Sequence, residues 1–133
     1  MTALTQDTNI IRRDGVDFVF PVAAGAWIHA GAVVALNADG YAVPGTTATD
    51  LQGAGIAQAA ADNRTGAAGS VTIAVRRGCY QLANSAAADT IRRCDIGKPC
   101  YIVDDNTVAL TATGKSQAGV IRDVDGNGVW VEF

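Results

Sequence analysis

Several features that would point to a specific chemistry are scarce in this chain of 133 residues. No run of Lys or Arg exceeds two residues and the net charge is −3, so the basic footprint of a nucleic-acid-binding protein is missing. His29 is the single histidine, and the sequence offers no serine or cysteine triad built around it. The composition therefore favours a protein that is not an enzyme and binds no nucleic acid.

Cysteine is too sparse and too irregularly spaced for a zinc site. The three cysteines are Cys79, Cys94 and Cys100, and the spacing of the last two matches no zinc-binding motif. An odd number of cysteines without a secretory leader is typical of reduced thiols in a protein made in a cytosol. The longest apolar stretch, residues 22–36, is interrupted by glycines and is too short to cross a bilayer. We expect no metal, no cofactor and no membrane partner.

Large side chains are also few. Aromatic residues make up 6% of the chain, whereas glycine accounts for 15 residues, so tight turns are favoured over a thick core. A domain of this size with small side chains buries only a modest core. Association with a partner stabilises such a domain, so we expect a protein that works within an assembly.

What the chain does contain is a pattern of glycine-punctuated strands that occurs twice, at residues 27–78 and 93–133. Each copy has a glycine turn, a strand, a polar turn, a second strand, another glycine and two closing strands. Two pairs of glycines mark the correspondence: Gly31 with Gly97, and Gly55 with Gly119. Short strands with regular turn signals are typical of all-β folds. The sequence predicts a mainly β protein, a small β-sandwich or barrel built from two pseudo-repeated β modules.

Local patterns predict individual strands and turns. Residues 16–20 alternate and precede Pro21, which predicts a strand end or a sheet edge. The sequence Asn-Ala-Asp-Gly at residues 37–40 predicts a hairpin turn, because its glycine tolerates a positive φ. Residues 71–75 alternate cleanly with β-branched side chains, which predicts a further strand.

Two segments differ from this β pattern. Residues 85–93 are the helical candidate, about two turns long, with Asn84 or Ser85 as its N-cap and basic residues in its last turn. Residues 1–15 are polar and lack helical periodicity, which predicts an extended N-terminal arm. The expected organisation is therefore this arm followed by a single β domain at residues 16–133.

Two short motifs imitate ligand-binding loops without completing them. Residues 114–116 look like the end of a phosphate-binding loop, but Ala109 occupies the position of its first glycine. Residues 123–128 copy the first half of a calcium loop, but its closing glutamate would fall beyond Phe133. The Asp-Gly-Asn-Gly sequence within the second motif instead predicts a hairpin.

Several segments between residues 25 and 133 share a longer pattern of strands, glycines and aromatic residues. They are residues 31–34, 55–57, 75–82, 96–104, 119–120 and 128–131. Their order and spacing resemble the small capsid decoration (cement) proteins of tailed phages. The resemblance rests on the spacing of glycines and strands more than on any one signature residue.

The resemblance implies a structural virion protein that binds the outer surface of an expanded capsid and clamps neighbouring major capsid subunits. It implies two partners, the major capsid protein and further copies of this chain, often as a homotrimer. The expected location is the virion, after synthesis in the host bacterial cytoplasm. An extended arm can add a strand to a partner sheet. Position and character select these capsid-binding residues: Ile10, Ile11, Arg12, Arg13, Phe18 and Phe20.

Two other functions stay open at this point. A tail or fibre subunit, or a carbohydrate-binding module, would use Trp27 or Trp130 as a stacking surface. A small hydrolase would use Asp104 or Asp123, and it would need a cleft in which polar groups converge.

Overall fold

The computed structural model describes residues 3–133, and short strands make up 42% of the chain. The mainly β class predicted from the sequence is confirmed. The strands are β1 (Asp17–Pro21), β2 (Trp27–Ile28), β3 (Val33–Leu36), β4 (Ala42–Pro44), β5 (Gln52–Ala57), β6 (Ala61–Asp62), β7 (Thr72–Arg76), β8 (Cys79–Asn84), β9 (Pro99–Ile102), β10 (Thr107–Ala109), β11 (Gln117–Asp125) and β12 (Gly128–Glu132).

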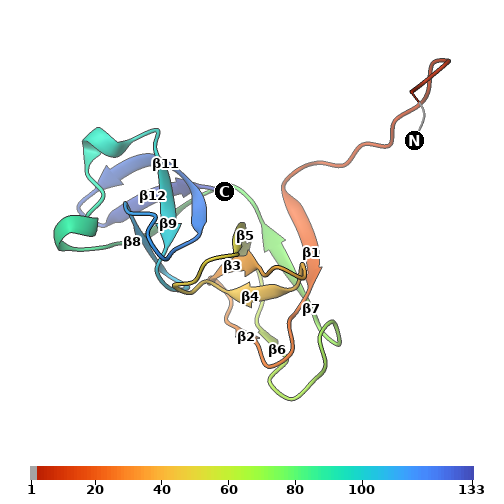
Figure 1. The fold of residues 1–133 in the computed structure, drawn as a ribbon, viewed down its shortest axis with the longest axis horizontal. Helices are drawn as coiled ribbons and strands as arrows, with labels where there is room; N and C mark the ends of the chain where they lie inside the picture. The colour runs from red at the N-terminus through yellow and green to blue at the C-terminus, as the bar shows by residue number, and fades with distance from the viewer. Residues whose placement is uncertain (1–2) are drawn as a thin grey trace.

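These strands form two lobes that lie side by side (Figure 1). Lobe 1 contains the sheet β1-β7-β5-β3-β4 and the small sheet β2-β6, and lobe 2 is the closed barrel β10-β8-β12-β11-β9. Two residues, Arg77 and Gly78, connect the lobes between β7 and β8. Of the two β architectures expected from the sequence, a barrel is the one that lobe 2 adopts.

The two lobes pair their strands in the same order. The series β1-β7-β5-β3-β4 in lobe 1 corresponds, strand by strand, to the series β8-β12-β11-β9-β10 in lobe 2. Neighbouring strands within each series are antiparallel. In lobe 2 a parallel pairing of β8 with β10 closes the ring. In lobe 1 the corresponding place has a single parallel bridge, from Val22, the residue after β1, to Ala42 on β4.

A bulge occurs at the corresponding place in each lobe. Ala54 on β5 has no partner residue on β3, and Ala118 on β11 has none on β9. Next to each bulge lies a glycine, Gly55 or Gly119, whose added Cβ would stand 2.6 Å or 2.2 Å from a carbonyl oxygen of the neighbouring strand. These two positions require glycine because the neighbouring backbone occupies the space of a side chain.

Two apolar clusters form the interior. The cluster inside lobe 1 consists of Val22, Ile28, Ala32, Val34, Ala42, Ala57, Ala61, Ile73 and Val75. The second cluster fills lobe 2 and extends into lobe 1, where it includes Val33, Ala35 and Ile56. Successive residues of a strand point to opposite faces, so β3 sends Val34 into lobe 1 and its two neighbours toward lobe 2.

Most of the predicted strands and turns are confirmed. β3 and β4 form the hairpin expected at residues 37–40, where the side chain of Asn37 accepts backbone N–H bonds from Asp39 and Tyr41. β7 coincides with the strand predicted at residues 71–75. β1 ends at Pro21 and lies at an edge of its sheet, as the proline indicates.

The helix predicted at residues 85–93 is wrong. Two 3₁₀ turns of three residues, Ala87–Asp89 and Arg93–Asp95, occupy this region instead. The cause lies in the side chain of Asn84, which binds both the N–H and the carbonyl oxygen of Ile91. This contact bends the segment into a loop and buries Ile91, which is 1% exposed. A side chain that can cap a helix can also bind backbone groups in a loop.

Residues 3–15 form neither helix nor strand, and every one of them is exposed. Figure 1 shows this N-terminal segment leading away from lobe 1. Residues 1 and 2 of the predicted arm lie outside the described residues.

Candidate functional site

Three of the six residues predicted to bind the capsid come together at β1. The rings of Phe18 and Phe20 stack with centroids 6.0 Å apart and an angle of 13° between their planes. The guanidinium carbon of Arg13 lies 5.8 Å from the centroid of the Phe18 ring, within reach of a cation–π attraction. These side chains form a half-exposed apolar and basic surface where the N-terminal segment joins the lobe.

The other three predicted residues lie farther out on the N-terminal segment. Ile10 and Ile11 are 75% and 98% exposed, so neither packs against the body of the protein. Arg12 lies 3.8 Å from Asp14, and both side chains are exposed, so this ion pair contributes little to stability. The structure therefore separates the predicted set into a β1 group and a solvent-exposed group.

The hydrogen bonds at both ends of β1 show which backbone groups bind β7. The N–H of Arg77 donates to the carbonyl of Val16 over 2.8 Å, and the N–H of Val22 donates to the carbonyl of Val71 over 2.9 Å. In an antiparallel pair the residues that bond across the ladder alternate with residues that do not. The even-numbered residues of β1 therefore face β7.

The odd-numbered residues of β1 point their backbone groups to the open side of the strand. Asp17 and Val19 each present an N–H and a carbonyl there, whereas Pro21 presents only a carbonyl. Val19 is 65% exposed. Because only one bridge joins this side of the lobe to β4, β1 offers a short free edge to which a further strand can be added.

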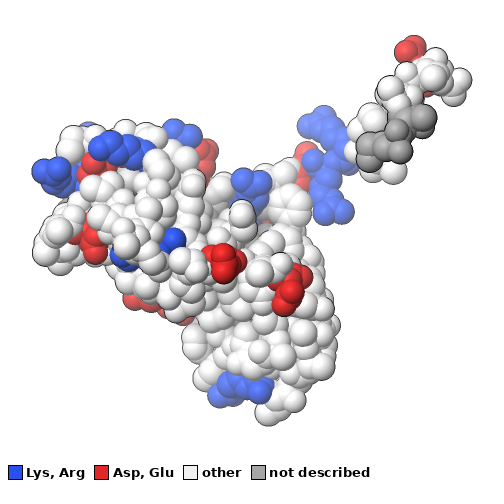
Figure 2. Space-filling view, viewed as in Figure 1, with Lys and Arg blue, Asp and Glu red and all other residues white. Residues whose placement is uncertain are grey.

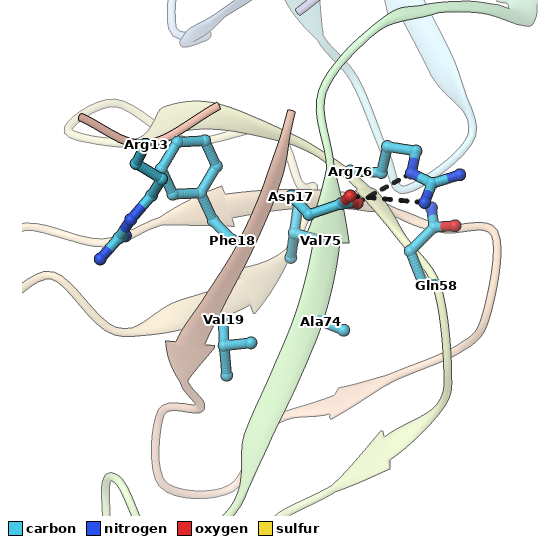
Figure 3. A pocket seen from close by; sticks show the side chains of 8 residues that line it. All are labelled: Arg13, Asp17, Phe18, Val19, Gln58, Ala74, Val75 and Arg76. Carbon is cyan, nitrogen blue, oxygen red and sulfur yellow. Dashed lines mark hydrogen bonds and ion pairs between the residues drawn. The ribbon is translucent and has the colours of Figure 1, made fainter. Parts of the chain in front are cut away.

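A depression of about 570 Å³ lies over the paired strands β1 and β7 (Figure 3). Its lining consists of Arg13, Asp17, Phe18, Val19, Gln58, Ala74, Val75 and Arg76. Arg76 donates to the Asp17 carboxylate over 2.8 Å, and this hydrogen bond raises the pKa of Arg76. The depression thus combines apolar surface with a paired charge, which suits protein contact.

A second depression, of about 400 Å³, also borders β1, and we call it the lobe 1 depression. It is lined by Phe18, Phe20, Leu36, Gln52, Gly53, Ala54 and Arg77. Sequence reasoning found its two phenylalanines but missed Leu36, Ala54 and Arg77. No local pattern could have identified these three residues, because they lie on separate segments that only the tertiary structure brings together.

Trp27, one of the two tryptophans, lies on β2 and is 42% exposed. The guanidinium carbon of Arg64 lies 3.8 Å from the ring centroid, and the His29 ring is 4.5 Å away. Asp62 holds Arg64 through two hydrogen bonds, and these lower the pKa of Asp62 to about 2. The neighbouring cation covers part of the indole that a sugar would need.

Trp130 belongs to the β11–β12 hairpin, which contains the sequence that imitates a calcium loop. Its indole N–H donates to the Asp125 carboxylate over 3.2 Å, and the backbone N–H of Asn127 donates over 2.8 Å. The bond from Asn127 is the main cause that lowers the pKa of Asp125, and the bond from Trp130 adds to it. The hairpin predicted here is confirmed. The Asp125 carboxylate accepts hydrogen bonds from within the hairpin itself.

The segment that imitates a phosphate-binding loop also has a structural role. The Ser116 hydroxyl donates to the carbonyl of Ala48 over 2.6 Å and accepts the N–H of Leu51 over 3.0 Å. No helix follows Ser116, because β11 begins at the next residue. This serine joins the loop after β4 to lobe 2.

The remaining candidates for chemistry are scattered. Cys79 and Cys94 are exposed, whereas burial raises the pKa of Cys100 to about 11. Asp104 accepts a backbone N–H in its own turn, and Asp123 pairs with an arginine. Within residues 3–133, no three His, Cys, Asp or Glu side chains lie close enough together to hold a metal ion.

On the face shown in Figure 2, acidic and basic side chains are dispersed among uncharged ones. None of the helices described in residues 3–133 has the length and apolar character needed to span a bilayer. Comparisons of this chain with family models, curated proteins and solved structures find no match.

Proposed function

We propose that this protein is a structural virion protein that binds the outer surface of an expanded phage capsid and stabilises it. In this proposal it clamps neighbouring major capsid subunits and acts as a homo-oligomer, a trimer. The observation that carries the proposal is the N-terminal segment, whose exposed Ile10 and Ile11 lead into the free edge of β1. The resemblance of residues 25–133 to capsid decoration proteins supports the same function.

The energetics of the N-terminal segment support a role on a partner surface. Fixing the backbone of such a segment costs roughly 1–2 kcal/mol per residue. Adding a strand to a partner sheet offsets this cost through main-chain hydrogen bonds and burial of the two isoleucines. A capsid presents the same site many times, and simultaneous contacts multiply a modest affinity.

The body of the protein suits a structural role, because its two lobes pack together as one unit. We infer that the two lobes are copies of one duplicated β module, because their strand order and their bulges correspond. Each copy is bound to the other through a shared apolar cluster. Further copies of the chain would cover sheet edges, such as β1, that one small molecule leaves open.

Deletion of residues 1–15 tests the proposal directly. We expect the truncated protein to remain folded, because residues 3–15 make no strand with the body, and to lose its coating of bare, expanded heads. Electron microscopy of heads mixed with each protein measures the coating, and circular dichroism measures the fold. Normal coating by the truncated protein would refute the clamping by this segment.

A matched pair of variants locates the contact within the segment. Replacing both isoleucines, in the variant Ile10→Asp/Ile11→Asp, should abolish coating, since each aspartate would be buried at the partner surface. The control Thr8→Asp/Asn9→Asp adds the same charge nearby and should retain most of the coating. Equal loss in both variants would assign the effect to charge alone.

The alternative function is a tail or fibre subunit or a carbohydrate-binding module. No contact within residues 3–133 favours it, because Arg64 covers part of the Trp27 ring and the Trp130 indole donates a hydrogen bond to Asp125. Retention of the protein on insoluble polysaccharide, lost in Trp27→Ala, would support this alternative over capsid binding.

A further inference from the structure

The fold covers corresponding surfaces of the two lobes unequally. We call the outward side of β3 and β5 in lobe 1, and of β9 and β11 in lobe 2, the outer face. We call the end of the lobe 2 barrel near its bulge, and the corresponding end of the curved sheet in lobe 1, the barrel end. Within the molecule, the outer face of lobe 1 packs against the barrel end of lobe 2. This leaves the barrel end of lobe 1 and the outer face of lobe 2 without such a cover.

The covered pair is tightly buried. The outer face of lobe 1 contributes Val33, Ala35 and Ile56, which are 0%, 0% and 7% exposed. The barrel end of lobe 2 contributes Leu82, Ile102 and Ala118, which are 4%, 0% and 6% exposed. All six belong to one apolar cluster.

Polar contacts fix the geometry of this covered pair. The N–H of Val33 donates to the carbonyl of Asp105 in lobe 2 over 2.8 Å. Gly53 of lobe 1 leaves no room for a side chain, because an added Cβ would lie 2.3 Å from the carbonyl oxygen of Ala118. The backbones of the two bulges are therefore in direct contact.

The barrel end of lobe 1 is the lobe 1 depression. Strand pairing matches Phe20, Leu36 and Ala54 to Leu82, Ile102 and Ala118. The three lobe 1 residues remain half-buried and line a space of about 400 Å³. Lobe 1 covers the barrel end of lobe 2, but nothing in the described residues covers the matching barrel end of lobe 1.

The outer face of lobe 2 is the exposed counterpart. Strand pairing matches Pro99, Tyr101 and Val120 to the buried Val33, Ala35 and Ile56. Pro99 is exposed, and Tyr101 and Val120 are half-buried. A tyrosine where lobe 1 has alanine makes this face project farther than its counterpart.

We propose that the lobe 1 depression of one copy receives the outer face of lobe 2 of a second copy. The occupant is inferred from the molecule's own packing, in which the same kind of face already covers the same kind of barrel end.

The contact is head-to-tail, so successive copies close into a ring when the rotation between them permits. Pro99 has no N–H, whereas Val33 at the matching position uses its N–H to bind lobe 2. The contact between copies therefore differs in geometry from the contact between lobes. This inference rests on the self-association within the proposed function and names the surfaces that carry it.

Two charged variants block one surface each. Ala54→Arg fills the depression and leaves the outer face of lobe 2 intact. Val120→Asp puts a charge on the outer face of lobe 2 and leaves the depression intact. In light scattering coupled to gel filtration, we expect the wild-type protein to be an oligomer and each variant to be a monomer of about 13.6 kDa. An equimolar mixture should form a heterodimer of twice that mass, because one intact depression and one intact face remain.

Two further variants control for the effect of added charge and for misfolding. Thr72→Arg places the same charge on an exposed strand position of lobe 1, outside both surfaces, and should keep the wild-type mass. Tyr101→Lys replaces Val120→Asp if circular dichroism shows that the latter does not fold. An oligomer that survives either blocking variant, or a mixture that stays monomeric, overturns the assignment of surfaces while leaving self-association intact.

A wild-type protein that is monomeric at high concentration overturns both the surfaces and the proposed self-association. Coating of expanded heads by that monomer would still uphold capsid binding. The two failures are therefore distinguishable.

Discussion

Lobe 1 and lobe 2 arrange their strands alike but fill and close them differently. In lobe 1, four of the nine residues of the inner cluster are alanine, and one bridge joins β1 to β4. Lobe 2 fills its barrel with larger side chains, Ile91, Ile102 and Ile121 among them, and closes it with a two-residue pairing. Buried apolar area stabilises a fold in proportion to its size, so lobe 2 is expected to be the more stable lobe.

The difference shows how one strand order serves two roles. The barrel end of lobe 2 packs against the outer face of lobe 1. This contact buries apolar side chains of lobe 1 that its own small core does not bury. Lobe 1 keeps an open barrel end and a free β1 edge, and both are available to partners. The predictions below test this division, and they begin with the largest expected effect.

Removal of a side chain from each barrel end compares covered and open positions. Ile102→Ala should lower the free energy of unfolding by about 2–5 kcal/mol, as expected for a fully buried side chain. Leu36→Ala, at the matching position of lobe 1, should cost roughly half as much or less, since a half-buried side chain leaves a smaller cavity. Urea unfolding at low protein concentration measures both values. Equal losses would mean that Leu36 is covered as deeply as Ile102 in solution.

The bulge glycines test whether close backbone approach is shared by the lobes. Gly55→Ala and Gly119→Ala should each lower the free energy of unfolding by about 1–3 kcal/mol, because the added methyl group meets a carbonyl oxygen. Gly126→Ala is the control, since no atom lies within 4 Å of its added Cβ, and its stability should stay close to wild type. A neutral effect at Gly119 would contradict the observed strand approach.

The turn before β9 in lobe 2 should respond to acid through a buried carboxylate. Asp95 is buried there, and the N–H of Arg92 is the main cause that lowers its pKa, followed by the Lys98 ammonium. Because the pKa is lowered on folding from 3.8, the carboxylate stabilises the fold above that value. This contribution is lost as the pH falls through the folded pKa.

Asp95→Asn should therefore reduce stability at pH 7 and little, if at all, at a pH below the folded pKa. Urea unfolding of wild type and variant over that range measures the difference. Asp39→Asn, at an exposed turn of lobe 1, is the control for loss of a surface carboxylate and should leave stability at pH 7 close to wild type. A constant gap between wild type and Asp95→Asn at every pH would contradict the role of the charge.

Local sequence patterns predicted much of this architecture. The alternation of residues 71–75, the turn at 37–40 and the proline after β1 each specify structure through neighbouring residues. The helix expected at residues 85–93 failed because Asn84 and Ile91 bind one another and bury the isoleucine. Such a contact competes with helix propensity and is not visible in a local pattern.

The candidate site was predicted in part. Phe18, Phe20 and Arg13 lie together as a sequence neighbourhood suggests, since alternate residues of a strand share a face. Leu36 and Ala54 join the two phenylalanines in the lobe 1 depression only because the sheet brings β3 and β5 to the same depression as β1. Their role could not be read from residues that lie far from the phenylalanines along the chain.

By itself, the amino-acid sequence determined where most strands and turns form, because alternation, proline and turn chemistry act over a few residues. The tertiary structure alone decided which barrel end is covered, which is open, and which edge of β1 is free. Those properties depend on contacts between distant segments, where burial by the other lobe outweighs local preference. The outer face of β3 and β5 is therefore buried, whereas the matching face of β9 and β11 lies at the surface.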